Sequence, residues 1–147
     1  MAKRRVELQE HFTPEEYELI IKDNTGRLII KGQKLSRPNK RIVLHQKGLK
    51  VRSAQIVRLG KKADQSYELA RINHLPTFQQ VRLHTNEMIY PGSYKITVDY
   101  DLTTDKIQKL REAAERIPSR ELMPSVDEKI TRAKVAYKLI YIDDSEK

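Results

Sequence analysis

The chain has 147 residues, of which 38% are hydrophobic and 33% charged, with five Gly and six Pro; this balance is typical of one globular domain and excludes a disordered or low-complexity chain. The absence of Cys excludes disulfides, thiolate metal sites and thiol nucleophiles. The net charge of +9 is concentrated in residues 1–62, which hold 16 Lys and Arg against 6 Asp and Glu, whereas the rest of the chain holds 13 against 14.

Alternation of apolar and polar residues with period two dominates the chain and predicts strands with one buried face. In the first such run, Tyr17, Leu19 and Ile21 share one face. The turn-forming residues 23–26 follow and precede an apolar run at 28–35, so we expect a β-hairpin. Further short strands, separated by Gly, Pro or clusters of charge, are expected at 42–45, 50–59, 67–73 and 79–83.

The clearest strand begins after the turn at 90–92, and its apolar positions are Tyr94, Ile96, Val98 and Tyr100. A last alternating strand is expected around Ala133, Val135, Tyr137, Leu139 and Tyr141. The segment 84–87, which includes His84, follows a predicted strand and is interpreted as a surface turn.

One segment has a helical period instead. Apolar residues recur at spacings of three and four after Thr103, at Ile107, Leu110, Ala114 and Ile117. This spacing predicts a short amphipathic helix near 104–117 that ends at Pro118 and lies on a sheet. We therefore predict an all-β, mainly antiparallel, sandwich-like fold with this one helix. Its parts are a flexible basic N-terminus at 1–11, a single β domain at 12–142 and an acidic C-terminal tail at 143–147.

Known catalytic and cofactor motifs are missing from the sequence. The four His are His11, His45, His74 and His84, and no two of them have the i, i+4 spacing of a zinc-binding helix. No phosphate-binding glycine loop and no nucleophile elbow occurs. The neighbouring carboxylates Asp127 and Glu128 could act as acid and base, but adjacent acids on a loop are usually solvated. We predict no catalytic residue, no metal site, no cofactor and no enzymatic activity.

The seven Tyr allow two interpretations. They could be stacking platforms for single-stranded nucleic acid. However, Tyr17, Tyr94, Tyr100 and Tyr137 lie in phase with Leu, Ile and Val on predicted strands, which favours a place in the core or on a sheet face.

The basic first half also allows two interpretations. It could be a solvated face that keeps the protein soluble, or it could attract a polyanion such as nucleic acid. In the second case the candidate phosphate contacts are Lys34, Arg37, Lys40, Arg41, Lys50, Arg52, Arg58, Lys61 and Lys62. The basic start has no apolar segment after it and nowhere do eighteen apolar residues run together, so we expect a cytoplasmic protein without a membrane span.

Several motifs in order resemble the N-terminal β domain of the zinc aminopeptidase family, which includes aminopeptidase N and leukotriene hydrolase. The matching stretches are Tyr17-Glu-Leu19, Gly32, Ile42-Val43-Leu44-His45, Leu49-Lys-Val51, Pro91-Gly92-Ser-Tyr94-Lys-Ile96-Thr-Val98-Asp-Tyr100 and Ser119-Arg120-Glu121-Leu122-Met123-Pro124-Ser125-Val126-Asp127-Glu128. They span residues 12–142. The resemblance implies a saddle-shaped assembly of mostly antiparallel sheets.

The departures from that family bear on function. Its catalytic domain, with the zinc helix, does not follow the β domain in this chain, so we expect no zinc peptidase activity. The resemblance places Ala113 where the family has a substrate-binding Gln, and it leaves Glu115 as a candidate contact for a peptide amine. The leading hypothesis is a non-catalytic interaction module for a protein or peptide, or a partner of a separate catalytic chain. The alternative is a nucleic-acid or ribosome-associated binder that uses the basic half.

Overall fold

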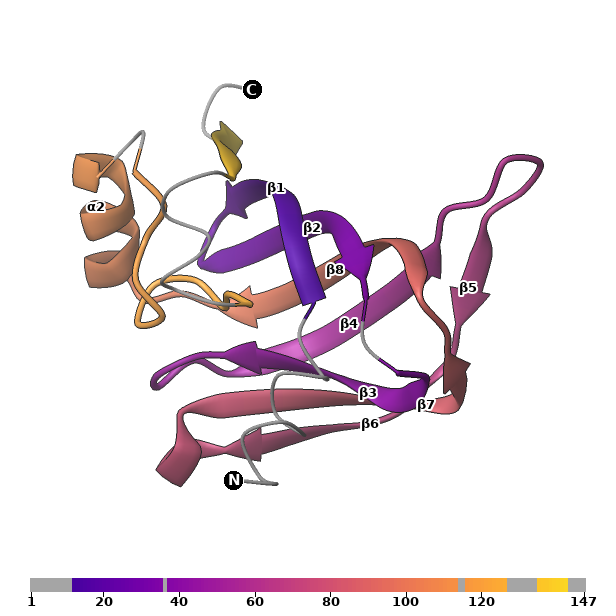
Figure 1. Cartoon of the computed structure of the whole chain (residues 1–147). Coiled ribbons are helices and arrows are strands. Elements are labelled where there is room, and N and C mark those ends of the chain that lie inside the picture. Colours follow the sequence, from indigo (N-terminus) through magenta and orange to yellow (C-terminus); the bar gives the residue numbers. More distant parts are fainter. Residues whose placement is uncertain (1–11, 36, 114–115, 127–134, 143–147) are drawn as a thin grey trace.

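The computed structural model describes residues 12–35, 37–113, 116–126 and 135–142, which form two β-sheets, one α-helix and one short 3-10 turn (Figure 1). The larger sheet has six strands, in the order β5 (Gln65–Tyr67), β4 (Val51–Arg58), β8 (Gly92–Asp101), β2 (Thr25–Lys34), β1 (Phe12–Lys22) and β9 (Ala136–Ile142). The smaller sheet has three, in the order β3 (Asn39–His45), β7 (Gln80–Ile89) and β6 (Leu69–Leu75). All strand pairs are antiparallel except β1 with β9, which is parallel. The prediction of an all-β, mainly antiparallel fold is confirmed.

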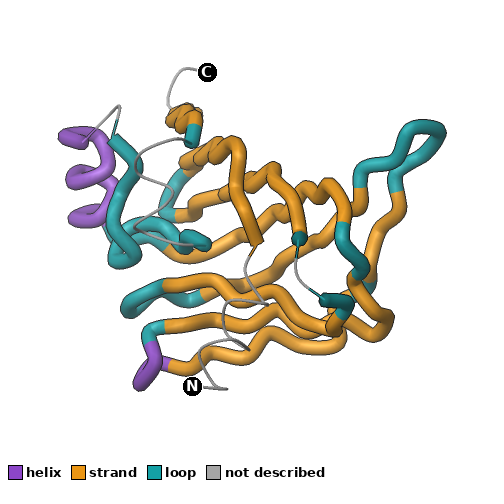
Figure 2. The backbone as a smooth tube through the Cα atoms, viewed as in Figure 1, coloured by secondary structure: helices purple, strands orange, loops and turns teal. Residues whose placement is uncertain are grey.

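The two sheets enclose one hydrophobic core between them (Figure 2). Alternation along the long strands β1, β2 and β8 sends every second side chain into this core, and burying each large apolar side chain contributes about 1.5–3 kcal/mol. In β8 the fully buried residues are Tyr94, Ile96, Val98 and Tyr100, as predicted. From the smaller sheet, Leu44, Val81 and Leu83 complete the core.

The expected hairpin is present between β1 and β2. Lys22 pairs with Thr25, so the turn itself consists of Asp23 and Asn24. Asp23 has a left-handed backbone with φ of 56°, a conformation that Asp tolerates better than most residues. The Asn24 side chain donates to the carbonyl of Leu102 at 3.1 Å, which ties this turn to the end of β8.

The predicted helix is shorter than the sequence pattern indicated. Helix α2 spans Thr104–Ala113, and residues 114–115 lie outside the described part of the chain. The hydroxyl of Thr103 accepts a hydrogen bond from the Lys106 N–H, which caps the start of the helix. Leu110 is buried, and Ile107 and Ile117 pack against the same core, so the expected apolar stripe does face the sheets.

Two predictions of local structure are wrong. The run 67–73 is not one strand, because the chain leaves the six-stranded sheet after Tyr67 and enters the three-stranded sheet at Leu69. The segment 84–87 is not a surface turn but part of β7, where Thr85 is buried. In both cases the pairing is supported by Glu68, whose carbonyl accepts from the Asn86 N–H at 3.2 Å and whose carboxylate accepts from the Asn86 side chain.

Candidate functional site

The face of the six-stranded sheet that points away from the core, here called the open face, carries the candidate site. Strand register places four of its residues side by side across the sheet. Asp99 on β8 lies opposite Ser53 on β4 and opposite Arg27 on β2, and Arg27 lies opposite Ile20 on β1. Side chains opposite each other on one sheet face are within contact distance. The fold therefore joins residues up to 79 positions apart in the sequence into one row.

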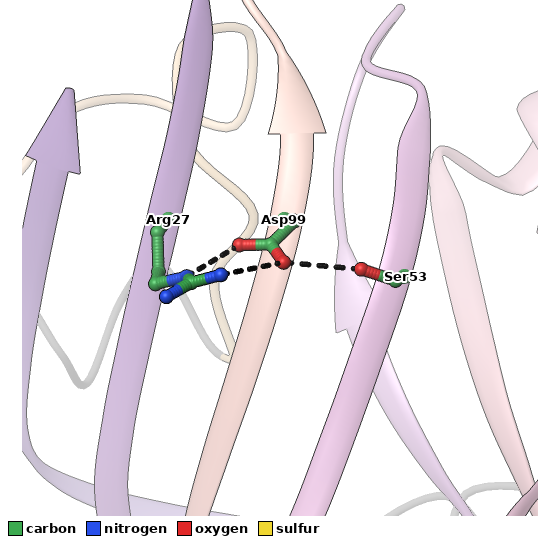
Figure 3. Close-up of polar contacts among 3 residues, drawn as sticks. All are labelled: Arg27, Ser53 and Asp99. Atoms are coloured by element: carbon green, nitrogen blue, oxygen red, sulfur yellow. Dashed lines mark hydrogen bonds and ion pairs between the residues drawn. The ribbon is translucent and has the colours of Figure 1, made fainter. Parts of the chain in front are cut away.

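Asp99 is the centre of a hydrogen-bonded network on this face (Figure 3). The guanidinium of Arg27 donates to both carboxylate oxygens, from Nε to Oδ1 at 2.8 Å and from Nη2 to Oδ2 at 3.3 Å. The Ser53 hydroxyl donates to Oδ2 at 3.1 Å. The hydrogen bond from Arg27 is the main reason that the pKa of Asp99 is lowered, so this carboxylate stays ionised near neutral pH.

A second ion pair lies at the edge of the same face. Arg52 sits at the β-bulge between Val51 and Ser53, which turns its side chain toward Asp101. The distance from Arg52 Nη2 to Asp101 Oδ2 is 2.8 Å, and this contact lowers the pKa of Asp101 and raises that of Arg52. Both side chains are well exposed, so the pair orders the surface more than it stabilises the fold.

Two adjoining hollows lie along the open face and share Arg27, Ser53 and Asp99 as a common wall. The larger has a volume of about 610 Å³ and is lined by Ile20, Lys22, Asp23, Thr25, Arg27, Arg52, Ser53, Asp99 and Ile142. The smaller has a volume of about 420 Å³ and is lined by Arg27, Ile29, Ser53, Ala54, Gln55, Lys95, Thr97 and Asp99. Ile142, at the end of β9, is 45% exposed, so the apolar part of the lining is accessible.

The groups in these hollows are suited to holding a ligand. Ser53 donates its proton to a carboxylate whose lowered pKa makes it a weak base, and no imidazole is among the residues that line either hollow. Across the described part of the chain, no three His, Cys, Asp or Glu side chains gather as a metal ion would require. What the site offers is two fixed ion pairs, several hydroxyl and amide groups, the half-buried side chains of Ile20 and Ile29, and the exposed side chain of Ile142.

The nine cations predicted as phosphate contacts do not form one surface. Lys34 is only 1% exposed, and its ammonium donates to the Asn39 side chain at 3.0 Å, so it cannot serve as a surface contact in this structure. Lys50 and Arg52 lie at the start of β4, and Arg58 lies at its end, seven residues from the start of the strand. At the strand rise of about 3.3 Å per residue, these positions are roughly 20 Å apart.

The remaining predicted cations are spread over β3 and two loops. Lys40 and Arg58 line a third hollow, of about 520 Å³, between the two sheets, and Arg58 donates to the Pro91 carbonyl at 3.0 Å. Arg37, Lys61 and Lys62 are exposed on loops, whereas Arg41 is on β3 in the other sheet. Glu115, the candidate contact for a peptide amine, lies outside the described residues, as do Asp127 and Glu128.

The sequence interpretation missed a different group of cations, on the outer side of the three-stranded sheet. His84 on β7 lies opposite Arg41 on β3 and opposite Arg71 on β6. Arg82, two residues before His84, points to the same side, because Val81 and Leu83, which alternate with them along β7, are buried. In the sequence, the only sign that these residues share a face is that Arg71 and Arg82 occupy polar positions of the alternating pattern.

The motifs that resemble the aminopeptidase domain meet around residues 119–126. His45 exchanges two backbone hydrogen bonds with Ser125, at 2.6 and 2.9 Å. The Tyr100 hydroxyl donates to the Leu122 carbonyl at 2.8 Å, and the Tyr17 hydroxyl accepts from the Val126 N–H at 3.0 Å. The four matched stretches that contain these residues therefore form one connected unit.

Within the described ranges no helix could span a membrane, because α2 is too short and too polar to cross a bilayer. Neither the known protein-family models nor the curated proteins contain a match to this sequence.

Proposed function

We propose that this chain is a non-catalytic binding module that holds a protein or peptide partner on the open face of its six-stranded sheet. The observation that supports the proposal is the pair of adjoining hollows, in which fixed polar groups stand beside partly or fully exposed isoleucines. Binding sites typically combine an apolar lining with a few well-placed polar groups. Because Arg27, Asp99 and Ser53 already hold one another in place, less side-chain entropy is lost when a partner binds.

The charges around the hollows favour a partner with acidic groups. Of the four cationic side chains that line them, Arg27 and Arg52 are paired with Asp99 and Asp101, which leaves Lys22 and Lys95 against Asp23 among the lining residues. The isoleucines at positions 20, 29 and 142 would contact apolar side chains of the partner. The expected ligand is therefore a peptide segment with apolar and acidic residues close together.

Selection from a phage-displayed library of random 12-residue peptides tests this proposal. We expect the enriched peptides to combine acidic and apolar residues. We also expect them to shift the backbone amide NMR signals of β1, β2 and β8 at outward positions such as Ile20, Ile29 and Thr97. Enriched peptides that shift only signals elsewhere, or a selection that yields no binder, would contradict the proposal.

The resemblance to the aminopeptidase domain suggests a more specific partner, a separately encoded catalytic chain of that family. The supporting observation is that residues 119–126 are anchored to His45, Tyr100 and Tyr17, which all belong to matched stretches. Affinity purification from a cytoplasmic extract of the native cell should then recover a metallopeptidase in a 1:1 ratio. Recovery of neither a metallopeptidase nor another stoichiometric protein would contradict both versions of the proposal.

The non-catalytic part of the proposal has its own test. Purified protein is incubated with aminoacyl and peptide substrates, with and without added zinc. We expect no turnover, because the open face offers an ionised carboxylate and a serine without a base. Clear turnover that co-purifies with the chain would overturn this part.

The alternative function, nucleic-acid binding through the basic first half of the sequence, is weakened in its original form. Lys34 is buried, and the other predicted contacts are divided between opposite ends of β4 and the loops. Scattered surface cations more often serve solubility than recognition.

A further inference from the structure

The outer side of the three-stranded sheet carries a compact cationic surface, here called the arginine face and defined by Arg71, Arg82 and His84. His84 and Arg71 are directly paired across β7 and β6, and Arg82 is paired with Asn73 in the next row. On the other side of β7, the same rows contain Arg41 and Val43 of β3. These rows contain no carboxylate, so the positive charge of the arginine face is not neutralised within the sheet.

The polar groups of the arginine face have few partners of their own. Among the described residues, no carboxylate pairs with Arg71 or Arg82, and the nitrogens Arg82 Nε and His84 Nε2 are buried without a hydrogen-bond partner. Arg82 does donate from Nη2 to the Gln80 side chain at 3.3 Å, which holds its guanidinium on this face. Buried polar atoms without a partner are costly, so the protein itself leaves these two side chains poorly satisfied on this face.

We propose that the arginine face binds the phosphate groups of a single-stranded nucleic acid. A guanidinium presents a planar fork of donors that matches phosphate oxygens, and two such forks lie within neighbouring rows of this sheet. Asn73, in the row of Arg82, and Gln80, in the row beyond it, add side-chain donors and acceptors that can reach base edges.

A nearby aromatic residue favours a nucleic acid over an acidic peptide. Phe78 is 64% exposed in the turn Pro76–Phe78, which connects β6 to β7 at the end of the arginine face. The strand ends that flank this turn, Leu75 and Gln80, pair with each other. Cationic side chains combined with an exposed ring are the usual means of binding single strands, because every base can stack on an aromatic face.

Fluorescence anisotropy with a labelled 12-nucleotide oligouridylate tests the proposal. The double variant Arg71→Gln/Arg82→Gln should bind at least tenfold more weakly than the wild type at low salt. The slope of log affinity against log salt should also become shallower by about 1.4, the value for two lost phosphate contacts on a single strand.

The matched control is Lys61→Gln/Lys62→Gln, which removes the same charge from the exposed loop between β4 and β5. It should retain most of the affinity. An equal loss in both double variants would overturn the proposal, because only overall charge would then matter. Equally tight binding of a 12-residue polyglutamate peptide would also overturn it, in favour of an acidic protein ligand.

A measurement on the wild type avoids any effect of the variants on folding. Burial and the charges of Arg71, Arg41 and Arg82 lower the pKa of His84 in the free protein. A phosphate bound beside the imidazole would favour its charged form and raise that pKa. NMR titration of the His84 ring protons should show this rise when oligouridylate is added, and an unchanged titration would contradict the proposed site.

Discussion

The hydroxyl groups of two tyrosines should respond in opposite ways to the same substitution. Tyr100 is almost completely buried, and its hydroxyl donates to the Leu122 carbonyl at 2.8 Å. In Tyr100→Phe the ring still fills its place in the core, so the loss is that of the hydrogen bond that joins β8 to residue 122. Such a loss costs about 1–2 kcal/mol, since the carbonyl is left without this donor.

Tyr137 provides the matched control. Its hydroxyl is also buried, but no described residue forms a hydrogen bond with it. Tyr137→Phe removes a desolvated polar group without breaking a bond, so the free energy of unfolding should stay the same or rise by up to about 1 kcal/mol.

Urea unfolding of both variants, followed by circular dichroism at pH 7.5, measures the difference. We expect the midpoint to fall for Tyr100→Phe and to remain or rise for Tyr137→Phe, with an unchanged slope. In thermal unfolding, the loss at Tyr100 corresponds to a decrease in Tm of roughly 2–8 °C for a domain of this size. Equal destabilisation of the two variants would refute the reasoning that hydrogen bonding, and not burial alone, anchors the segment 119–126.

Three further predictions concern pH and packing. Burial, and then the nearby charge of Lys50, lowers the pKa of His74, whose Nε2 accepts a hydrogen bond from the Val51 N–H at 3.0 Å. Because the unfolded chain binds the proton more readily, the stability of the fold should decrease as pH drops below about 6.5. His74→Gln should weaken this dependence in urea midpoints measured at pH 8 and pH 5.5. The pKa of Asp99 is lowered mainly by Arg27, so the contribution of this carboxylate to the free energy of unfolding is present above about pH 3.8 and is lost as pH falls through its pKa in the folded state. Because the ion pair is partly exposed, Asp99→Asn should cost less than about 1 kcal/mol at pH 7. A larger loss in urea unfolding would show that the network is structural. Gly32→Ala would place a Cβ 2.3 Å from a backbone carbonyl oxygen of β1, so it should lower the unfolding free energy by about 1–3 kcal/mol, and an unchanged midpoint would contradict that close approach.

Local patterns in the sequence predicted those elements whose structure depends on neighbouring residues. The alternation from Tyr94 to Tyr100 identified β8, and the spacing of Ile107 and Leu110 identified α2. Turn-forming residues at Asp23 likewise marked the first hairpin.

The choice of sheet could not be predicted in the same way. Tyr67 and Leu69 belong to a continuous pattern, yet Tyr67 pairs with Ile56 of the preceding strand β4 and Leu69 with Thr85 of the following strand β7, so the sheet that each residue joins depends on its partner strand. The parallel pairing of β9 with β1 depends in the same way on contacts more than 100 residues apart. A period of two reports which side of a strand is buried, and it carries no information about the partner.

The candidate sites were missed for a related reason. Arg27 and Asp99 are 72 residues apart, and each occupies a polar position that a solvated strand face would also contain. Arg71, Arg82 and His84 are likewise ordinary alternating positions until the register brings them together. Counting charge by sequence half directed attention to Lys34, which the fold buries.

The most direct test of the binding-module account compares two matched substitutions. Ile29 lies on the open face of the six-stranded sheet and Val43 on the outer side of the three-stranded sheet, and both are half-buried β-branched residues. Ile29→Lys places a charge in the smaller hollow. Calorimetric titration with a library-selected peptide should therefore show an affinity at least tenfold below that of the wild type. Val43→Lys should leave the peptide affinity within about twofold of the wild-type value. Equal affinity for wild type and Ile29→Lys, with both variants folded, would contradict the claim that the open face is the binding surface.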